Sequence, residues 1–484
     1  MRKSGSLVWL RHDLRLADQP ALTAALRQGG PVYPVFIDSP GEEAAWAPGG
    51  ASRWWLHQSL QSLATALERC GSRLVIRRGE SLAELLALVR ETGADAVFWN
   101  RRYEPAITAR DAQIKLQLRA AGLTVESFNG ALLHEPWTIA NQSGKPFQVF
   151  TPFWRHCLAK PEPEEPLPAP KHLPAPDRWP KSSELAALGL EPRPDWAGGL
   201  RAAWTPGETG AHTVLRRFCT AALAGYTGNR NRPDLAGTSR LAPHLHFGEL
   251  SPRQVWHALR LAGDANAQLA GWRSSQFVAE LGWREFAHHL LHHFPHTPTE
   301  PLRAEFKHFP WQDDADALHA WQRGQTGFPL VDAGMRELWT TGWMHNRVRM
   351  VVASFLVKDL RLPWQAGARW FWDTLVDADL AQNTLGWQWT TGCGADAAPF
   401  FRVFNPVSQG EKFDPQGDYV RLWCPELARL PAEWIHQPAK APANVLANAG
   451  VKLGINYPEP IVNHATAREV ALEAYASIKR KLTK

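Results

Sequence analysis

The chain has 484 residues, of which 44% are hydrophobic and 21% carry charge. This composition is typical of a soluble globular protein and excludes wholesale disorder. No apolar run approaches the ~18 residues that a membrane span needs, so we expect no membrane association. The five cysteines include no CxxC pair, and the first residues are too charged for a secretory signal. Both features favour a reducing cytoplasm over a disulfide scaffold, a zinc ribbon or a secreted protein.

The formal net charge of +6 permits a nucleic-acid partner but does not require one. There is no basic tail, so a DNA-binding surface would have to be a local patch. The 24 tryptophans are the unusual number in the composition. Tryptophan packs well, but it also stacks and is easily oxidised, so its excess is a first indication of function.

Short apolar runs alternate with helical patterns in the first part of the chain. The expected strands cover residues 7–10, 32–38, 73–77, 96–100 and 124–128, and helices are expected near 20–28, 52–70, 81–92 and 104–121. Strands that are apolar on both faces and alternate with helices predict a doubly wound parallel sheet. No GxGxxG follows the first strand, which disfavours an ordinary dinucleotide site there.

Ten prolines fall within residues 161–194, and such a segment cannot sustain a helix or a central strand. Beyond residue 205, long helical patterns predominate to the end of the chain, the last over 465–481. We therefore predict an α/β domain over residues 1–135, a proline-rich linker over 136–204 and a larger all-helical domain over 205–484.

Two segments in the helical part carry candidate chemistry. Residues 225–241 form a polar loop whose glycines, hydroxyls and arginines could hold a pyrophosphate, although a solvated loop is an equally simple reading. Glu280, Trp283 and Arg284 share one helix face and suit a planar, polar ligand such as a nucleobase. The alternative is an ordinary Glu–Arg pair beside a core tryptophan.

Ordered motifs along the whole chain resemble those of the photolyase/cryptochrome family. They include Trp9-Leu-Arg-His-Asp-Leu-Arg-Leu, Thr238-Ser-Arg-Leu, Glu280-Leu-Gly-Trp-Arg-Glu-Phe, Gly342-Trp-Met-His-Asn-Arg, Phe355-Leu-Val-Lys-Asp-Leu, Asp377-Ala-Asp and Asp396-Ala-Ala-Pro-Phe-Phe-Arg-Val-Phe-Asn-Pro. Within the family, the chain resembles DNA photolyases that split cyclobutane pyrimidine dimers. Trp99-Asn-Arg-Arg-Tyr-Glu and Gly392-Cys-Gly-Ala-Asp-Ala-Ala favour the bacterial class III branch.

The resemblance implies a folded-over FAD in the helical domain. Tyr226 and residues Thr238, Ser239, Arg240 and Leu241 would hold its phosphates and ribose. Asp379 would accept a hydrogen bond from the flavin ring, and Asp377 would pair with Arg349 because a buried carboxylate needs a partner. Asn383 would face flavin N5, where its amide can donate or accept.

The resemblance also implies UV-damaged DNA as the partner of a monomeric enzyme, with the lesion flipped out of the duplex. Glu280 and Asn346 would hydrogen-bond the flipped bases, and Met350 lies one turn after Asn346 on the same helix face. Phe277, Trp283 and Trp389 would provide apolar walls for the lesion. Phosphate contacts, which position DNA without reading its sequence, would come from Arg230, Arg284, Arg347 and Arg402.

The implied mechanism is light-driven electron transfer from reduced FAD to the dimer and back, in which the protein supplies positioning and electrostatics. Trp387, Trp364 and Trp311 match the family's chain for reducing oxidised flavin in light. The histidines at 288, 289, 292, 293 and 296 suggest a metal, but no carboxylate or cysteine completes a tetrahedral set. We therefore expect no metal.

Two departures from the family pattern matter. Folate-binding class I relatives typically carry an Asn-Glu pair where this chain has Ala106 and Ile107. The antenna chromophore therefore stays open: methenyltetrahydrofolate bound differently, a deazaflavin, or none. Phe277 stands where related enzymes often have tryptophan against the lesion.

Two alternative functions also stay open. A (6-4) photolyase typically has histidines near the lesion, where this chain has Asn346 and Met350. A cryptochrome is a blue-light receptor, and plant-type receptors typically have Asp where Asn383 stands here. Many receptors also carry a long C-terminal tail, whereas this chain ends soon after its last expected helix. These features favour the enzyme that repairs cyclobutane dimers.

Overall fold

The computed structural model describes residues 4–397 and 401–482, and by its internal contacts the chain divides into two compact units. The first unit comprises Met1–Ala224, Ser239–Pro295 and Val376–Leu380. The second comprises Gly225–Thr238, His296–Leu375 and Ala381–Lys484. Residues 398–400, inside the family motif at 396–406, lie outside the described residues.

A five-stranded parallel sheet forms the centre of the first unit. Its strands are β1 (Ser6–Leu10), β2 (Val32–Asp38), β3 (Val75–Arg78), β4 (Ala96–Asn100) and β5 (Thr124–Phe128), in the order β3-β2-β1-β4-β5. Every residue of β1, β2 and β4 is buried, as expected for strands covered on both faces. The predicted doubly wound sheet is confirmed.

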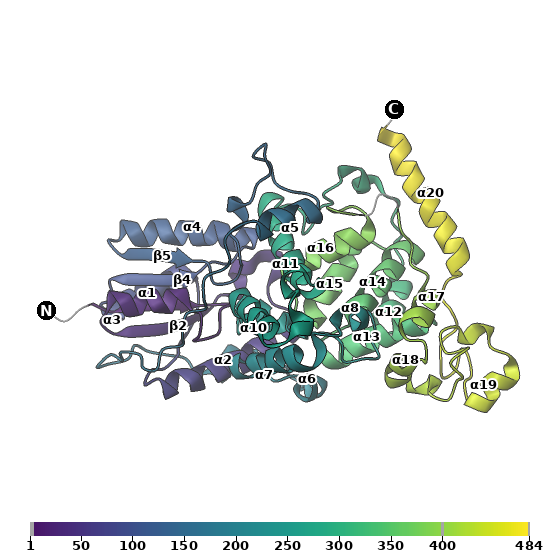
Figure 1. Ribbon diagram of the computed structural model, residues 1–484, viewed down its shortest axis with the longest axis horizontal. Helices are drawn as coiled ribbons and strands as arrows, with labels where there is room; N and C mark the ends of the chain where they lie inside the picture. Colours follow the sequence, from purple (N-terminus) through teal and green to yellow (C-terminus); the bar gives the residue numbers. More distant parts are fainter. Residues whose placement is uncertain (1–3, 398–400, 483–484) are drawn as a thin grey trace. The chain divides into compact units, whose positions relative to one another are not determined.

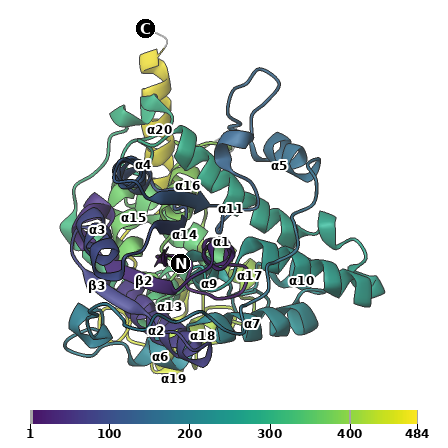
Figure 2. The ribbon, with the colours of Figure 1, turned by 90° about the vertical axis from the view of Figure 1, so that its left-hand side faces the viewer.

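Four helices connect and cover these strands: α1 (Pro20–Gln28), α2 (Gly50–Arg69), α3 (Ser81–Thr92) and α4 (Pro105–Ala120). Figure 1 shows α4 running alongside β5, and Figure 2 shows α3 next to β2 and β3. The third strand begins at Val75 rather than Arg73, because its pairing with β2 starts at the Val35–Val75 contact.

The rest of the first unit is helical. It contains α5 (Phe150–Leu158), α6 (Gly198–Ala203), α7 (Glu208–Arg217), α9 (Ala242–His246), α10 (Pro252–Ala265) and α11 (Gln276–His293). Local sequence fixes two of these helix starts: Ser251 and Gln254 form a capping box before α10, and the Ser275 side chain accepts a hydrogen bond from the Val278 amide.

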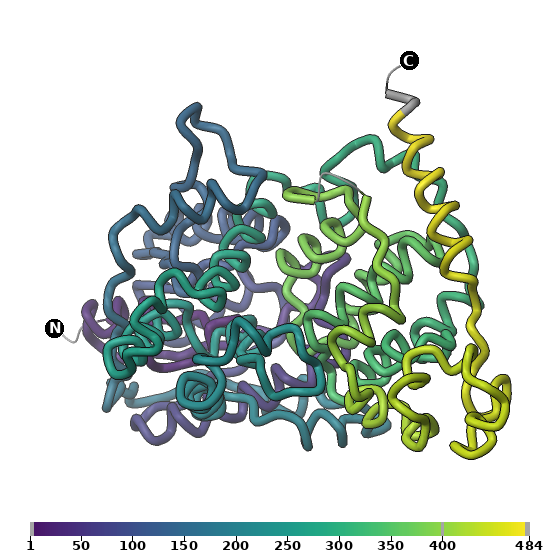
Figure 3. Tube along the Cα trace, turned by 45° about the vertical axis from the view of Figure 1, so that its right-hand side comes forward, coloured from purple at the N-terminus to yellow at the C-terminus, as the bar shows by residue number. Residues whose placement is uncertain are grey.

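Helices also make up the second unit. They are α8 (Tyr226–Asn229), α12 (Ala315–Gln322), α13 (Pro329–Thr341), α14 (Asn346–Ser354), α15 (Trp364–Thr374), α16 (Leu380–Thr391), α17 (Pro406–Phe413), α18 (Asp418–Trp423), α19 (Ala443–Ala449) and α20 (His464–Leu482). Figure 3 shows α20 as the yellow helix before the C-terminus. Among the described residues, none of the helices is both long and apolar enough to cross a membrane.

The contact pattern does not follow the predicted boundaries at residues 135 and 204. Residues 136–204 belong entirely to the first unit, and they contain α5 and α6. The proline-rich stretch within them has no α-helix between α5 and α6, in agreement with its composition. The division into a sheet domain, a linker and a helical domain therefore stays a prediction, and each compact unit is described on its own.

Candidate functional site

The predicted cofactor residues fall in both units. Ser239, Arg240, Leu241, Asp377 and Asp379 belong to the first, and Tyr226, Thr238, Arg349 and Asn383 belong to the second. The predicted lesion and phosphate contacts are divided in the same way, with Phe277, Glu280, Trp283 and Arg284 in the first unit and Arg230, Asn346, Arg347, Met350, Trp389 and Arg402 in the second. The three predicted electron-transfer tryptophans, Trp311, Trp364 and Trp387, lie in the second unit.

Asp379 lies among histidines of the first unit. Its Oδ2 atom accepts a hydrogen bond from Nδ1 of His246 at 3.4 Å and lies 3.7 Å from Nε2 of His288. Burial alone would raise the pKa of Asp379, but the His288 and His246 imidazoles and the Arg284 guanidinium outweigh it and hold the pKa well below its usual range. Asp379 is therefore an ionised hydrogen-bond acceptor, and the flavin ring as its predicted donor stays a prediction.

The predicted phosphate loop combines a strained residue with hydroxyl groups. Arg240 has a φ of 54°, which is uncommon for a residue with a side chain, and its guanidinium lies 4.3 Å from the centre of the Trp204 ring. The Ser239 hydroxyl accepts from the Leu241 amide at 3.4 Å. In the second unit, Gly237 packs so closely on Asn229 that a Cβ there would lie 2.7 Å from the Asn229 Cβ. Two hydroxyls and an arginine thus follow one another in residues 238–240, and their phosphate role stays a prediction.

The start of α14 carries two predicted residues of the second unit, Asn346 for the lesion and Arg347 for a phosphate. Its cap is the buried His345, whose Nδ1 accepts from the Arg347 amide at 3.2 Å. Asn346 is exposed, and Arg349 donates from Nε to the Met344 carbonyl at 2.8 Å. Because His345 turns the chain into the helix at this point, Asn346 and Arg347 stand in its first turn.

Arg347 is fixed by its neighbours in the second unit. Its Nη2 donates to Oδ1 of Asn231 at 2.8 Å, and its guanidinium lies 4.5 Å from the centre of the Phe413 ring. Burial lowers the pKa of Arg347, and the positive charges of Arg230 and Arg402 lower it further. These three arginines therefore place positive charge in the same part of the second unit.

In the first unit, α11 carries the predicted Glu280 face. Gln276 donates from Nε2 to Oε1 of Glu280 at 2.9 Å, and Trp283 stacks on Phe150 at 3.9 Å with an angle of 9° between the rings. Arg284 donates to the Ala131 carbonyl at 2.7 Å. Phe277 is buried against Phe218, with ring centres 4.4 Å apart. The predicted base-binding face thus consists of residues already held in place by their neighbours.

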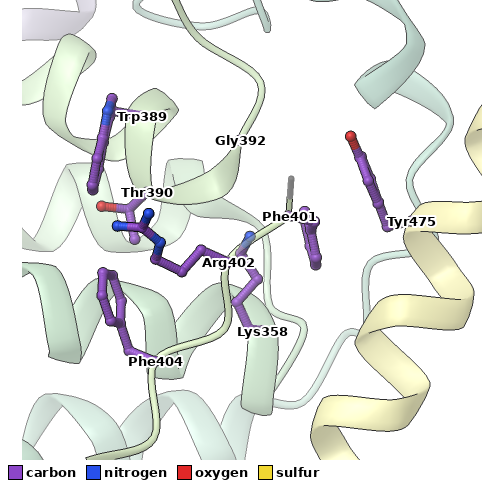
Figure 4. A pocket seen from close by; sticks show the side chains of 8 residues that line it. All are labelled: Lys358, Trp389, Thr390, Gly392, Phe401, Arg402, Phe404 and Tyr475. Atoms are coloured by element: carbon purple, nitrogen blue, oxygen red, sulfur yellow. The ribbon is translucent and has the colours of Figure 1, made fainter. Parts of the chain in front are cut away.

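Trp389 and Arg402 line a small cavity of the second unit, together with Lys358, Thr390, Gly392, Phe401, Phe404 and Tyr475. Figure 4 shows the Arg402 side chain extending between Trp389 and Phe404. Lys358 is buried, donates from Nζ to the Thr391 carbonyl at 3.0 Å and lies over the Phe401 ring. Burial lowers its pKa well below the usual range.

Trp387 is buried in the second unit at the contact between α15 and α16. A Cβ at Gly367 would lie 2.0 Å from Cη2 of Trp387, so only glycine permits this approach. The indole also packs edge-on against Phe371 and Trp321, at 5.1 and 6.3 Å between ring centres. Trp364 is buried and Trp311 is partly exposed beside Phe309. Trp387 and Trp364 are equally buried and only Trp311 reaches the surface, so the electron path through them stays a prediction.

Sequence reasoning missed three neighbours of these residues. His246 and His288 were not connected with Asp379, and Trp321 was not connected with Trp387. His246 lies 133 positions from Asp379 along the chain, so no local spacing links them. The many histidines in α11 could have indicated a partner for Asp379, but in the sequence they were considered only as metal ligands. Among residues 4–397 and 401–482, no group of three His, Cys, Asp or Glu side chains could hold a metal ion.

The residues at the predicted cofactor positions fit FAD by their chemistry. Asn383 donates from Nδ2 to the Ala368 carbonyl at 3.0 Å, which directs its amide oxygen elsewhere. Asp377 and Tyr226 are buried polar side chains. Carboxylates, an amide, hydroxyls and arginines are the groups that an isoalloxazine, a ribitol and a pyrophosphate require. Residues of these types are compatible with FAD, and their contacts with it stay a prediction.

One predicted antenna position does not fit a pterin. Ile107 is 1% exposed and packs inside the first unit from the first turns of α4. An aliphatic side chain in the core cannot hydrogen-bond a pterin ring, as the sequence indicated.

Comparison with known proteins agrees with this architecture. Residues 6–171 match the family described as DNA photolyase, and residues 277–477 match the FAD binding domain of DNA photolyase. The chain is 52% identical over 475 residues to the deoxyribodipyrimidine photo-lyase of Agrobacterium fabrum, covering 98% of each chain. It is 45% identical to Cryptochrome-1 of Arabidopsis thaliana, covering 98% of this chain and 70% of that protein.

The fold is similar to the crystal structure of a bacterial class III photolyase from Agrobacterium tumefaciens, with a TM-score of 0.95, 50% identity and coverage of 99% of this chain and 98% of that one. The chain belongs to the photolyase/cryptochrome family and carries its FAD-binding domain. The predicted family and fold are confirmed.

Proposed function

We propose that the protein repairs cyclobutane pyrimidine dimers in UV-damaged DNA, using light and bound FAD. The observation that carries the proposal is the similarity to a deoxyribodipyrimidine photo-lyase over 98% of both chains, which is higher than the similarity to the plant cryptochrome. Asn383, Asn346 and Met350 support it through the family resemblance, which implies Asp at the first position in plant-type receptors and histidines near the lesion in (6-4) photolyases.

When bound, reduced FAD supplies the electron that opens the cyclobutane ring after light absorption and recovers it afterwards. In the proposal, Tyr226 and residues 238–241 hold the phosphates and ribose. Asp379 accepts a hydrogen bond from the flavin ring and Asp377 neutralises Arg349. Asn383 presents its amide oxygen to the ring edge, because its nitrogen is already committed to the Ala368 carbonyl.

Glu280 and Asn346 hydrogen-bond the flipped lesion, with Trp283, Trp389, Phe277 and Met350 as apolar neighbours. Pairing of Gln276 with Glu280 presets the carboxylate, so less side-chain freedom is lost when the lesion binds. Arg230, Arg347 and Arg402 grip phosphates on the second unit. Arg284 is assigned to the same role, although its Nη1 also holds the Ala131 carbonyl.

The proposal also covers the electron path to the flavin, the antenna chromophore, the location and the oligomeric state. Trp387, Trp364 and Trp311 carry electrons to oxidised flavin. The first unit binds methenyltetrahydrofolate in a manner that does not use Ile107, or a deazaflavin, or no antenna, and chromatography of the chromophores released on denaturation distinguishes these outcomes. The protein acts as a cytoplasmic monomer.

A repair assay under blue light tests the proposal. Chemically reduced, FAD-loaded protein is mixed with DNA that contains a cyclobutane dimer, and restored pyrimidines are counted in light and in darkness. Repair should occur in light only. Glu280→Gln should bind FAD normally and repair more than tenfold more slowly, because one charge-assisted hydrogen bond contributes about 1.5–3 kcal/mol. Glu473→Gln, an exposed change on α20, is the matched control.

Four results would contradict the proposal or its residues. A protein that holds no FAD, or one that holds FAD but repairs no dimer, is not this enzyme. Loss of FAD in Glu280→Gln with unchanged repair per bound flavin would remove Glu280 from the lesion site. Robust repair of a (6-4) lesion would move the protein to the alternative enzyme class.

The similarity to Cryptochrome-1 favours a blue-light receptor as the second candidate. A receptor would hold FAD and photoreduce it without repairing DNA. Light-dependent repair by the purified protein therefore decides between the two.

A further inference from the structure

Three histidines and Asp379 lie together in the first unit. His12 follows β1, His246 ends α9 and His288 lies in α11. The His12 and His246 rings meet edge to face at 4.7 Å between centres. Nδ1 of His246 and Nε2 of His288 both face Oδ2 of Asp379, at 3.4 and 3.7 Å. One carboxylate oxygen therefore has two imidazole nitrogens as neighbours.

The hydrogen bond of Nδ1 of His288 determines whether Nε2 carries a hydrogen in the neutral ring. Nδ1 of His288 lies 3.0 Å from the Arg284 carbonyl oxygen, which can only accept, so Nδ1 carries a hydrogen. In a neutral His288, Nε2 then has a lone pair directed at a carboxylate oxygen. That arrangement is repulsive unless a proton lies on Nε2 or on Asp379. His246 differs, because a neutral ring can donate from Nδ1.

The charges around this group come from each neighbouring element. They are Arg11 and His12 after β1, Arg102 and Glu104 after β4, His246 in α9 and Arg284 in α11. Burial, with Arg102 and His246, lowers the pKa of His12 well below its usual range, so His12 is neutral near pH 7. Burial also lowers the pKa of His288, while Asp379 opposes this.

We propose that His288 and Asp379 form a proton-holding site, oriented by His246, that sets the charge beside the flavin ring. The proposal rests on the proposed function, in which Asp379 accepts a hydrogen bond from that ring. His246 and His288 are positioning residues, since they act through Asp379. With the proton present, the pair is neutral overall, and without it the pair carries one negative charge beside the flavin.

This charge change should be visible in the flavin itself. A negative charge added beside the ring shifts its absorption and makes it harder to reduce. The absorption of the oxidised, FAD-loaded protein is therefore followed in darkness from about pH 5 to 8. This range lies above the usual pKa of carboxylates and well below the usual pKa of tyrosine. Wild type should show a reversible spectral step with its midpoint below about 6.5, the ordinary histidine value.

His288→Gln should abolish the step, because glutamine keeps a polar side chain but cannot be protonated. His292→Gln, on the same helix beside Trp137, is the matched control and should retain it. His246→Leu should move the midpoint upward by about half a unit, since leucine cannot donate, so Asp379 loses one donor and then holds the His288 proton more strongly. This second variant keeps the test valid if His288→Gln fails to fold.

The outcomes separate the two proposals. A preparation that binds no FAD contradicts the proposed function. A preparation that binds FAD but shows no spectral step, or shows the same step in His288→Gln, overturns the proton-holding site and leaves the proposed function standing. An unchanged midpoint in His246→Leu would likewise remove His246 from the site.

Discussion

Trp387 shows how one side chain can be prepared for a function by its neighbours. Gly367 leaves room for the indole, and Phe371 and Trp321 enclose it in the second unit. Its Nε1 is buried without a hydrogen-bond partner. Leaving such a group unpaired costs about 1–3 kcal/mol, a feature that Trp387 shares with Trp9 and Trp54 of the first unit. The electron-transfer role of Trp387 therefore has to be tested by substitution.

Trp387→Phe should therefore slow the photoreduction of oxidised FAD while leaving the fold and the FAD content largely intact. Phenylalanine retains much of the packing but loses the oxidisable indole. Flavin absorbance is followed under blue light with a thiol reductant present, and a decrease of at least tenfold in rate is expected if the barrier rises by about 1.4 kcal/mol or more.

Trp256→Phe, a buried indole of the first unit, should behave like wild type. Trp364→Phe and Trp311→Phe should each slow photoreduction as well. Repair by chemically reduced protein should be unaffected in all of them. Photoreduction at the wild-type rate in Trp387→Phe would exclude the proposed route, whereas normal rates in the other two variants would remove only the outer steps.

Residues that share one element were predictable, and residues brought together by the fold were not. Glu280, Trp283 and Arg284 share a helix face because helical spacing places them there. The contacts of Asp379 with His246 and His288 join segments that are distant in sequence. The sequence analysis assigned Asp379 to the flavin ring and did not connect it with a histidine. Helical periodicity predicts which residues share one face of a helix, but it does not predict which helix faces pack against each other.

At the scale of elements, the strands were the most predictable parts, because burial on both faces leaves a continuous apolar run in the sequence. Helix α5 was missed within the predicted linker. Phe150, Phe153, Trp154 and Cys157 have helical spacing, and the last three are buried. The ten prolines in residues 161–194 led to the interpretation of all of residues 136–204 as a linker. A helix of 9 residues is short enough to be hidden in this way.

Glu285 connects α11 with the segment before α5. Its Oε2 accepts hydrogen bonds from the amides of Leu133 and His134, at 2.9 and 3.0 Å. Burial raises its pKa to about 7, although Arg284 and the two amides oppose this. The unfolded value is about 4.3, so the folded state binds the proton more tightly. The resulting stabilisation is fully present below about pH 4.3 and is lost as the pH rises through 7.

In the wild type, the titration of Glu285 should lower the free energy of unfolding by roughly 3 kcal/mol by pH 8. Glu285→Gln should remove this pH dependence, because glutamine does not titrate. The glutamine oxygen can still accept from both amides, so the contact with residues 133 and 134 survives. Urea midpoints are measured at pH 5 and pH 8 by tryptophan fluorescence. The wild-type midpoint should fall between these pH values by more than the variant's does.

Glu126→Gln, an exposed carboxylate on β5, is the control and should keep the wild-type dependence. If the wild-type and Glu285→Gln midpoints change in parallel, Glu285 is not protonated near neutral pH.

For the whole molecule, charge distribution matters more than net charge. The excess of six positive charges is small for 484 residues. Arg230, Arg347 and Arg402, however, lie near enough in the second unit to lower the pKa of Arg347. The sequence predicted a local patch and named these arginines. It could not predict that Asn231 and Phe413 hold Arg347 in place, because that depends on contacts between distant segments.

Arg347→Ala should weaken the binding of duplex DNA with and without a dimer by similar factors. The reason is that a phosphate contact releases counterions and carries no sequence or lesion information. The affinity is measured by fluorescence anisotropy between about 50 and 200 mM salt, a range over which phosphate contacts have large effects. The slope of log affinity against log salt should become shallower by about 0.9, the value for one phosphate contact on duplex DNA. Arg468→Ala removes the same charge from an exposed position on α20 and should leave the slope unchanged. Equal slopes in Arg347→Ala and wild type would show that Arg347 holds the protein's own Asn231 and touches no phosphate.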